Sequence, residues 1–272
     1  MGHYVGTIMK KSRPSSVVFA CVFILLLATY ANAAEFSFSR INSNSFTIEL
    51  NGIIKDGDDK LLLSAIKNDP YKFLLSSSII LSSLGGSVSE AIKIAEIIEM
   101  ASFMTIVNEG DTCASSCFLV LVAGQMRVMD GDILIHRPYI SADSYDSGDL
   151  YETTKAHQTL MQDVRKFLAA RAVPAYLIEY MMKKSSTEAY RLSIHDLIEL
   201  GGTSPFFEEI TIAKCGTSSQ DLMNPSISPE KKRCVQDIRS DNKVNFLTGL
   251  LSDEEYNEAV MKILKNNSPE AK

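Results

Sequence analysis

The stretch that decides the fold is Asp111-Thr112-Cys113-Ala114-Ser115-Ser116-Cys117, which an apolar run from Phe118 to Gly124 follows at once. Small polar residues here lie where a predicted strand ends and a predicted buried helix begins. The first N–H groups of a helix lack partners within it, and the helix dipole favours negative charge there. A serine at such a junction can act as a nucleophile, and the neighbouring amides can stabilise the oxyanion that it creates.

Two other short blocks carry the partners that a nucleophilic serine needs. Gly85-Gly86 follows a predicted short strand, and glycine lets backbone amides approach a substrate carbonyl with no side chain in the way. His136 ends another predicted strand, and imidazole is a base that works near neutral pH. Ser115 would attack a carbonyl, His136 would take the proton, and the amides of Gly85-Gly86 and Ser116 would form the oxyanion hole.

The remaining chain alternates predicted strands with predicted helices. Alternating apolar and polar residues over 36–51 indicate a strand, and further short strands are predicted at 78–81, 105–107, 127–129 and 133–135. Apolar residues at helical spacing predict helices at 60–67, 91–101, 157–168, 174–182 and 193–200. This order predicts an α/β fold with a mostly parallel sheet.

The composition changes beyond Phe206. Residues 214–242 are polar, contain two prolines and the charged run 230–233, and predict a loop or appendage. Ser252 and Glu255 form a capping box for a last amphipathic helix, so the chain ends in a polar C-terminal extension that closes with a helix. The predicted division is a signal peptide at 1–33, an α/β domain at 34–210 and this extension at 211–272.

The N-terminal segment predicts export. Three basic residues precede an apolar run of 13 residues from Val17 to Thr29, and Ala31-Asn32-Ala33 has the small-x-small pattern of a cleavage site. The run is short for a membrane anchor, since a bilayer span needs ~20 apolar residues. We therefore expect cleavage after Ala33, a periplasmic or secreted protein, and no membrane association after cleavage.

Charge excludes some partners. The segment 1–33 holds three of the 27 basic residues and none of the 33 acidic ones, so the mature chain has a net charge of −9. An acidic chain without a basic cluster argues against binding to nucleic acid or to anionic lipid.

Four cysteines lie outside the signal peptide, namely Cys113, Cys117, Cys215 and Cys234. An even number in an oxidising compartment suggests disulfides, and proximity in sequence favours the pairs Cys113–Cys117 and Cys215–Cys234. The first pair requires a non-helical backbone around Ser115, because an i,i+4 pair inside a regular helix bridges poorly. Zinc binding by the four is an alternative, but their spacing contains no C-x2-C pair.

Three blocks together resemble the signature blocks of the Clp protease proteolytic subunit, in the same order and at similar spacing. They are Leu81-Ser-Ser-Leu-Gly-Gly-Ser-Val-Ser-Glu-Ala91, Cys113-Ala-Ser-Ser-Cys-Phe-Leu-Val-Leu-Val-Ala-Gly124 and Ile133-Leu-Ile-His-Arg-Pro138. The chain is more closely similar to secreted Clp-protease-like proteins of bacteria that carry a Cys-Ala-Ser-x-Cys block. The resemblance covers about residues 46–202.

The resemblance implies a crotonase-like fold of repeated ββα units that assembles into rings or trimers, with a peptide or protein substrate and no cofactor or metal. By position, Ser115 matches the nucleophile and His136 the general base. Gly85 and the amide of Ser116 match the oxyanion hole, and Val88 would lie beside the substrate backbone.

One position departs from the family pattern. Where the family has the aspartate of its triad, this chain has Ser186. Loss of the orienting acid can cost ~10⁴ in turnover in a triad that depends on it. Either Glu188 reaches the histidine instead, or a backbone carbonyl orients the ring.

The sequence leaves alternatives open. Ser116 is an alternative nucleophile, although its place fits the amide donor better. His157 is expected to be a core or interface residue, and His195 a solvated residue at a helix start. The leading hypothesis is an exported serine peptidase that forms a homo-oligomer. The alternative is a non-catalytic binding or assembly protein with the same fold, while acyl-CoA chemistry does not suit an exported Ser/His pair.

Overall fold

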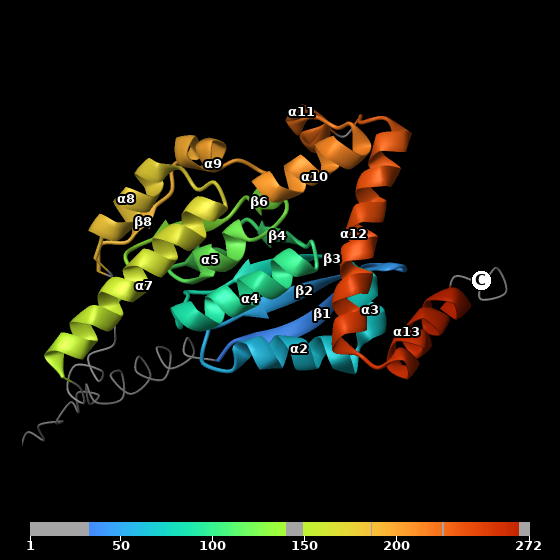
Figure 1. Ribbon diagram of the computed structural model, residues 1–272, viewed down its shortest axis with the longest axis horizontal. Helices are drawn as coiled ribbons and strands as arrows, with labels where there is room; N and C mark the ends of the chain where they lie inside the picture. Colours follow the sequence, from blue (N-terminus) through green and yellow to red (C-terminus); the bar gives the residue numbers. More distant parts are fainter. Residues whose placement is uncertain (1–32, 140–148, 186, 225, 267–272) are drawn as a thin grey trace, which may run out of the picture. The chain divides into compact units, whose positions relative to one another are not determined.

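The computed structural model describes residues 33–139, 149–185, 187–224 and 226–266 (Figure 1). Residues 1–32, which hold most of the predicted signal peptide, lie outside the described residues. The described residues from Ala33 onward belong to one compact unit.

A five-stranded sheet in the order β1-β2-β3-β4-β6 forms the centre of the fold. Its strands are β1 (Glu35–Asn42), β2 (Ser45–Asn51), β3 (Ser76–Ser82), β4 (Met104–Val107) and β6 (Arg127–Met129). β1 and β2 are antiparallel, and each of the other neighbouring pairs is parallel. The sheet is mostly parallel, as the sequence predicted.

The single strand predicted at 36–51 is in fact the hairpin of β1 and β2. The backbone N–H of Asn44 donates to the side chain of Asn42 at 2.9 Å, which is the local bond of an Asx turn. Alternation of apolar and polar residues continues through this turn, and for that reason the pattern alone did not separate the two strands.

A second sheet of three strands carries the serine and histidine blocks. β5 (Thr112–Ala114) is parallel to β7 (Asp132–Ile135), and β8 (Tyr190–Arg191) pairs antiparallel with β7. A parallel bridge between Ser83 and Cys113 joins this sheet to the end of β3. The glycine block that follows β3 is therefore brought next to the serine block that follows β5.

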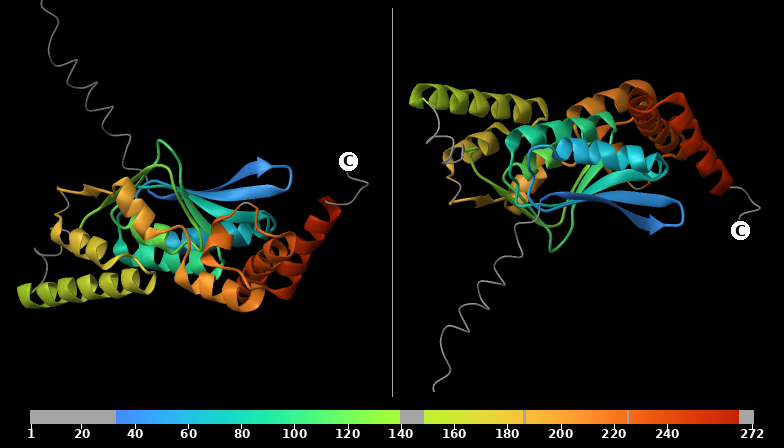
Figure 2. Two further views of the ribbon diagram at one scale, coloured as in Figure 1. Left: turned by 90° about the horizontal axis from the view of Figure 1, so that it is seen from above. Right: turned by 90° about the horizontal axis from the view of Figure 1, so that it is seen from below.

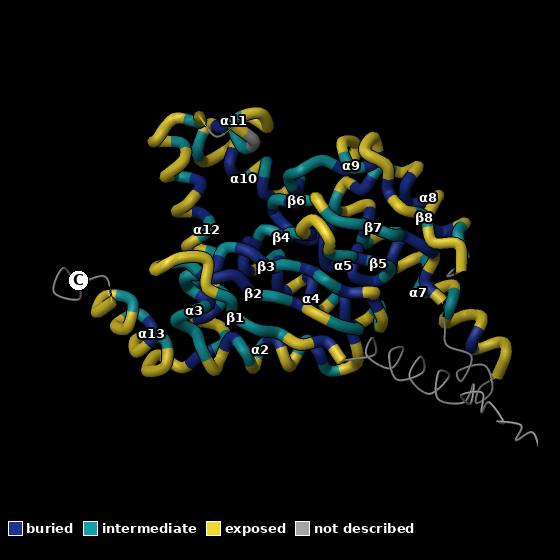
Figure 3. Tube along the Cα trace, turned by 180° about the vertical axis from the view of Figure 1, so that it is seen from behind, coloured by how far each residue is buried: buried dark blue, intermediate teal, exposed yellow. Residues whose placement is uncertain are grey.

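Helices pack against the strands. α2 (Asp58–Asn68) and α4 (Val88–Met100) lie along one face of the large sheet (Figure 2), and the short α3 (Pro70–Leu74) precedes β3. All six residues of α5 (Cys117–Val122) are buried, and Figure 3 shows the buried residues concentrated in the strands and in α5. Burial on all sides explains why this helix reads as an uninterrupted apolar run.

Arg127 connects the ends of three helices. Its guanidinium donates to the carbonyls of Val122, Leu200 and Arg171, at 2.8, 3.1 and 3.1 Å. These carbonyls lie at the C-terminal ends of α5, α9 (Ile194–Leu200) and α7 (Leu150–Ala170), where helix dipoles favour a cation. Burial, together with the charge of Arg171, lowers the pKa of Arg127 to about 10.

The C-terminal part is helical, and the loop predicted at 214–242 is wrong. α10 (Pro205–Cys215), α11 (Ser219–Met223) and α12 (Pro229–Leu250) occupy this region, and α10 crosses the predicted boundary at residue 210. The run 230–233 is the first turn of α12, since Pro229 stands at the start of a helix, where proline is tolerated.

The last helix, α13 (Asp253–Asn266), confirms the predicted capping box. The backbone N–H of Ser252 donates to the Glu255 carboxylate at 2.8 Å, and the N–H of Glu255 donates to the Ser252 hydroxyl at 3.4 Å. In the part of the chain that the structure describes, no helix combines the length and the apolar character that a membrane span requires.

Candidate active site

Ser115 lies in a sharp turn between β5 and α5. Its φ of 56° is in the left-handed region, which few residues other than glycine adopt. The N–H of Ser115 donates to the carbonyl of Leu134 at 2.9 Å, and its carbonyl accepts from the N–H of Phe118 at 3.1 Å. These two bonds fix the turn on both sides, and the serine side chain stays partly exposed.

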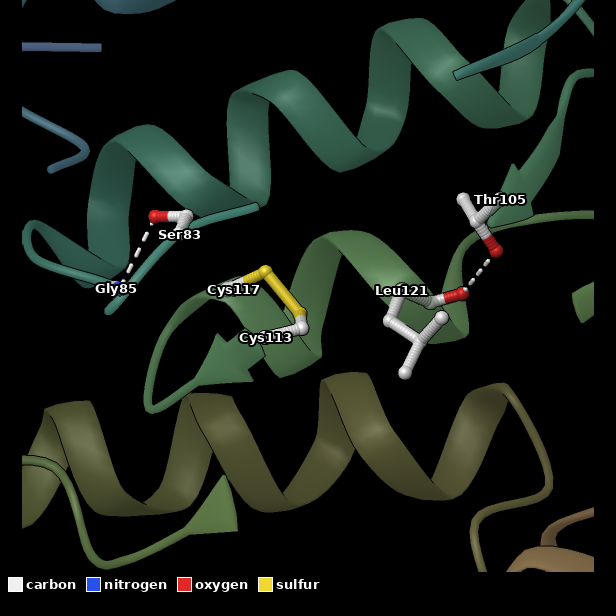
Figure 4. The surroundings of a disulfide bond; sticks show 6 residues. All are labelled: Ser83, Gly85, Thr105, Cys113, Cys117 and Leu121. Atoms are coloured by element: carbon white, nitrogen blue, oxygen red, sulfur yellow. Dashed lines mark hydrogen bonds between the residues drawn. A yellow bond between two sulfur atoms is a disulfide. The ribbon is translucent and has the colours of Figure 1, made fainter. Parts of the chain in front are cut away.

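The Cys113–Cys117 disulfide joins the two ends of this turn. Their Cα atoms are 5.3 Å apart, and both side chains are fully buried (Figure 4). The predicted pairing is confirmed, as is the non-helical backbone between the two cysteines. The second predicted pair, Cys215–Cys234, also forms a disulfide and joins α10 to α12.

Gly85 packs directly against the serine turn. A Cβ added at Gly85 would lie 2.6 Å from the carbonyl oxygen of Ala114, 2.7 Å from Cβ of Ser115 and 2.8 Å from the amide nitrogen of Ser116. Gly85 also has a φ of 87°, which side chains disfavour. Glycine is therefore required here for two reasons, and its Cα forms one wall of the serine site.

The two glycines differ in which amide is free. The N–H of Gly85 donates to the hydroxyl of Ser83 at 3.1 Å, so it is already occupied. Gly86 is exposed, and within the described residues neither its N–H nor the N–H of Ser116 has an acceptor. Of the three amides predicted to form an oxyanion hole, that of Gly85 is therefore occupied, and those of Gly86 and Ser116 are without an acceptor within the described residues.

The side chain of Ser116 is in a different environment from that of Ser115. Ser116 is 2% exposed, and its hydroxyl has no partner among the described residues. A buried hydroxyl is poorly placed to reach a substrate carbonyl. This contrast favours Ser115 as the attacking group and leaves the amide of Ser116 as its contribution.

His136 directly follows β7, the strand whose Leu134 carbonyl accepts the N–H of Ser115. Ser115 continues the parallel ladder of β5 and β7 through its bond to Leu134, which places it beside Ile135, the neighbour of His136. The Nδ1 of His136 lies 2.9 Å from the carbonyl of Arg137. When Nδ1 carries the proton and donates it to this carbonyl, Nε2 is left as the acceptor that a general base needs.

No carboxylate among the described residues is bonded to His136. Glu188 is exposed, and its side chain has no partner in the described part of the chain. Ser186, which occupies the position of the family aspartate, lies outside the described residues. The observed group that holds the ring is therefore the carbonyl of Arg137.

Two further histidines belong to the described residues, and neither is hydrogen-bonded to Ser115 or His136. Nε2 of His157 is 3.3 Å from the carbonyl of Pro138, so His157 secures the segment that follows His136. His195 is exposed, and its neighbour Asp196 is buried as the first-turn acid of a capping box with Ser193.

Asp196 is the centre of a network that the sequence did not reveal. Its carboxylate accepts from the hydroxyls of Tyr176, Tyr190 and Ser193 at 3.0, 2.7 and 2.7 Å. Burial opposes ionisation, but these hydrogen bonds outweigh it and lower the pKa of Asp196 to about 2. Tyr190 pairs with Ile135, so the network supports the strand that precedes His136.

Ser83 is a second residue whose role the sequence did not predict. It is buried, its backbone bonds to Thr112 and Ala114 of the serine block, and its hydroxyl accepts the N–H of Gly85 (Figure 4). Its place two residues before Gly85 was the available signal, but the bond forms only in one local backbone conformation, which spacing alone does not give.

Metal ligands are not assembled in the described part of the chain, where no group of three or more His, Cys, Asp or Glu side chains has the geometry to hold an ion. All four cysteines considered for zinc are consumed by disulfides.

Two comparisons with known proteins give a match, and a third gives none. A family model described as Clp protease matches residues 61–189, which include all three blocks. Among solved structures, a mutant ClpP1 from Listeria monocytogenes is similar, with a TM-score of 0.43 and 15% sequence identity, over 58% of this chain and 88% of that one. A search of curated proteins gives no match.

Proposed function

Because residues 61–189 of this chain are Clp-protease-like, we propose that the protein is an exported serine hydrolase, and specifically a peptidase. The observation that carries the proposal is the contact of Gly85 with the Ser115 turn. At this contact a partly exposed serine, a glycine without a Cβ to obstruct it and the free amide of Ser116 come together, and the free amide of Gly86 follows Gly85 directly in the chain. This is the arrangement that acyl transfer uses.

The proposed reaction has two stages. The hydroxyl oxygen of Ser115 attacks the peptide carbonyl while Nε2 of His136 takes its proton, and the amides of Gly86 and Ser116 hold the oxyanion. His136 then gives the proton to the leaving amine, which departs and leaves an ester on Ser115. Water hydrolyses the ester with His136 again as the base.

The missing acid is replaced in this proposal by the carbonyl of Arg137. A carbonyl that accepts from Nδ1 fixes the tautomer and the ring orientation, which are the main tasks of a triad aspartate. It does not supply a negative charge to stabilise the imidazolium, so we expect slow turnover. Glu188 would need to move to act as the third member.

The test is hydrolysis of a quenched fluorescent peptide mixture by wild type, Ser115→Ala and His136→Ala. We expect both variants to lose at least ~10³ in rate, since removing either member of a serine–histidine pair abolishes nucleophilic catalysis. His195→Ala is the matched control, because His195 is exposed on α9, and it should hydrolyse at the wild-type rate. Wild-type activity in Ser115→Ala would contradict the proposal.

A second candidate is a binding or assembly protein that keeps the fold without turnover. It is favoured by one observation: in the described residues no hydrogen bond joins Ser115 to His136, and no carboxylate supports the histidine. Binding of peptides to wild type and Ser115→Ala with equal affinity and without cleavage by either would support this candidate.

Export and assembly belong to the same proposal. We propose that the chain is cleaved after Ala33, that it acts in a periplasmic or secreted location, and that it forms a homo-oligomer. Two exposed isoleucines one turn apart on α9, Ile194 and Ile198, support assembly, since large apolar side chains gather at interfaces. N-terminal sequencing that starts at Ala34 and a native mass above that of one chain would agree with it.

A further inference from the structure

A cavity lies where the C-terminal helices meet the large sheet, away from the serine site. It has a volume of about 210 Å³ and receives residues from β4, α11 and α12, with Met126 immediately before β6. Five apolar side chains line it: Met104, Met126, Leu222, Ile227 and Val235. Arg239, from the middle of α12, lines it together with the charged side chains of Asp221 and Lys232.

The guanidinium of Arg239 is incompletely bonded. One terminal nitrogen donates to the sulfur of Met126 at 2.9 Å, which is a weak acceptor, and the group lies over the ring of Phe207 at 5.2 Å. Its Nε is buried without a partner. A guanidinium has five N–H donors, so most of its capacity is unused within the described residues.

No carboxylate of the described chain compensates this charge. Burial lowers the pKa of Arg239, and no acidic group acts in the opposite direction. Asp221 also lines the cavity, but its carboxylate is bonded to Lys231 at 2.8 Å and to the N–H of Ser218 at 2.8 Å. Arg239 as a whole is partly buried, and its Nε is buried without a partner. A cation withdrawn from water is ordinarily paired, so one without a partner indicates a ligand.

The next turn of α12 carries a second cation, Lys243, and not an acidic residue that would neutralise Arg239. Lys243 donates to the carbonyls of Leu74 and Ser76 at 3.0 and 2.8 Å and has no carboxylate partner in the described chain. Burial and the charge of Arg239 lower the pKa of Lys243 to about 8. An anion beside Arg239 would therefore meet a favourable field.

We propose that this cavity binds the carboxylate of a small aliphatic acid. The carboxylate accepts from Nε and a terminal nitrogen of Arg239 in the side-on bidentate geometry that guanidinium groups favour, and the aliphatic part packs on Met104, Leu222 and Val235. A free branched acid and the C-terminal residue of a peptide share this chemistry. The site is separate from Ser115 and does not depend on hydrolysis.

The test is calorimetric titration of the full chain with three probes of the same side chain. These are N-acetyl-leucine as the mimic of a peptide end, 4-methylpentanoate as the free acid, and N-acetyl-leucinamide as the uncharged match. We expect an acid to bind at least about tenfold more tightly than the amide, because a charge-assisted pair is lost in the amide. The acid that binds better identifies the source.

Variants locate the site on Arg239. Arg239→Met keeps an apolar chain against Phe207 and should weaken the acids about tenfold or more, whereas Arg233→Met, on an exposed arginine of the same helix, should bind as wild type does. If Arg239→Met does not fold, the comparison of acid with amide on wild type still decides. Equal affinity for acid and amide, no binding of either acid, or unchanged binding by a folded Arg239→Met would overturn the proposal.

Discussion

The serine turn depends on two residues, Ser115 and Gly85, which both have a positive φ and pack against each other. Ser115 adopts a left-handed backbone that places its Cβ against Gly85, and Gly85 adopts a positive φ that a side chain would disfavour. An alanine at Gly85 would meet backbone atoms at 2.6 and 2.8 Å, which cannot move aside as a flexible side chain can. The geometry of the site is therefore set by backbone contacts more than by side-chain hydrogen bonds.

Ser83→Ala tests whether the occupied amide of Gly85 matters. The change leaves the buried N–H of Gly85 without its acceptor, which typically costs ~1–3 kcal/mol and should let the glycine block shift. We expect modification of Ser115 by a fluorophosphonate to slow about tenfold. Ser82→Ala is the matched control, because the Ser82 hydroxyl has no partner among the described residues, and equal rates in both variants would argue against a positioning role for Ser83.

Asp196 predicts a pH dependence of stability. Its pKa of about 2 in the folded state lies below the unfolded value of about 4, so its contribution is complete above pH ~4 and is lost as the pH falls toward 2. The difference in the free energy of unfolding between wild type and Asp196→Asn should therefore be larger at pH 6 than at pH 3 in urea titrations. A difference that does not change with pH would show that the carboxylate is not held as described.

Sequence spacing was enough to indicate that the blocks around Gly85, Ser115 and His136 belong together, and the structure brings them to adjacent strand ends. Their catalytic roles remain predictions. The hydrogen bonds from the N–H of Gly85 to Ser83 and from the hydroxyl of Tyr190 to Asp196 were not predicted, although they are local in sequence. Such bonds form only in particular local backbone conformations, which residue spacing does not specify.

Among the elements, the short helix α5 and its disulfide hold the serine in place. The Cys113–Cys117 bond spans the one turn that must stay non-helical, and the amide of Ser116 in that turn is one of the two proposed oxyanion donors. Both cysteines are fully buried, so a soluble reductant cannot reach them without opening the fold. This disulfide is therefore a permanent brace and not an exposed redox switch.

Paired double variants separate bracing from general stability. Cys113→Ala with Cys117→Ala and Cys215→Ala with Cys234→Ala should each lower the free energy of unfolding by ~2–4 kcal/mol. Only the first pair should also slow fluorophosphonate modification of Ser115, because the second joins α10 to α12 away from the serine. An equal loss of modification in both would mean that stability alone explains the effect.

Some helices could be predicted from the sequence, and others could not. α4 and α5 were predictable because burial gives each a clear apolar pattern. α12 was not, since its charged and polar residues are spread around the helix and its burial depends on three scattered contacts, Val235, Ile238 and Leu247. Proline before the charged run suggested a loop, although it stands at the first position of a helix.

At the scale of the whole molecule, the last turns of α12 belong to the main core, whereas Phe207, Val235 and Ile238 form a second, small cluster between α10 and α12. Leu247 is fully buried in the same hydrophobic cluster as Leu62 and Ile79, and Phe246 packs against Phe73 with ring centroids 5.6 Å apart. Asn242 donates to the Ser102 hydroxyl at 2.6 Å. Although this region is polar in composition, a few of its residues make buried contacts with the main core.

Leu247→Ala measures this contribution. Removing a fully buried leucine side chain typically costs ~2–5 kcal/mol in the free energy of unfolding, and we expect one cooperative transition at a lower denaturant concentration. Asn245→Ala, on the exposed side of α12, should change stability by no more than about 0.5 kcal/mol. A Leu247→Ala protein as stable as the control would show that α12 is an independent appendage.

The central claim is that Ser115 is a nucleophile, and covalent modification mapped by mass spectrometry tests it most directly. Wild type treated with a fluorophosphonate at neutral pH should carry one phosphonyl group, located on Ser115, and Ser115→Ala should carry none while Ser116→Ala remains modified. An unmodified wild type, or a group attached to any other residue, would contradict the account.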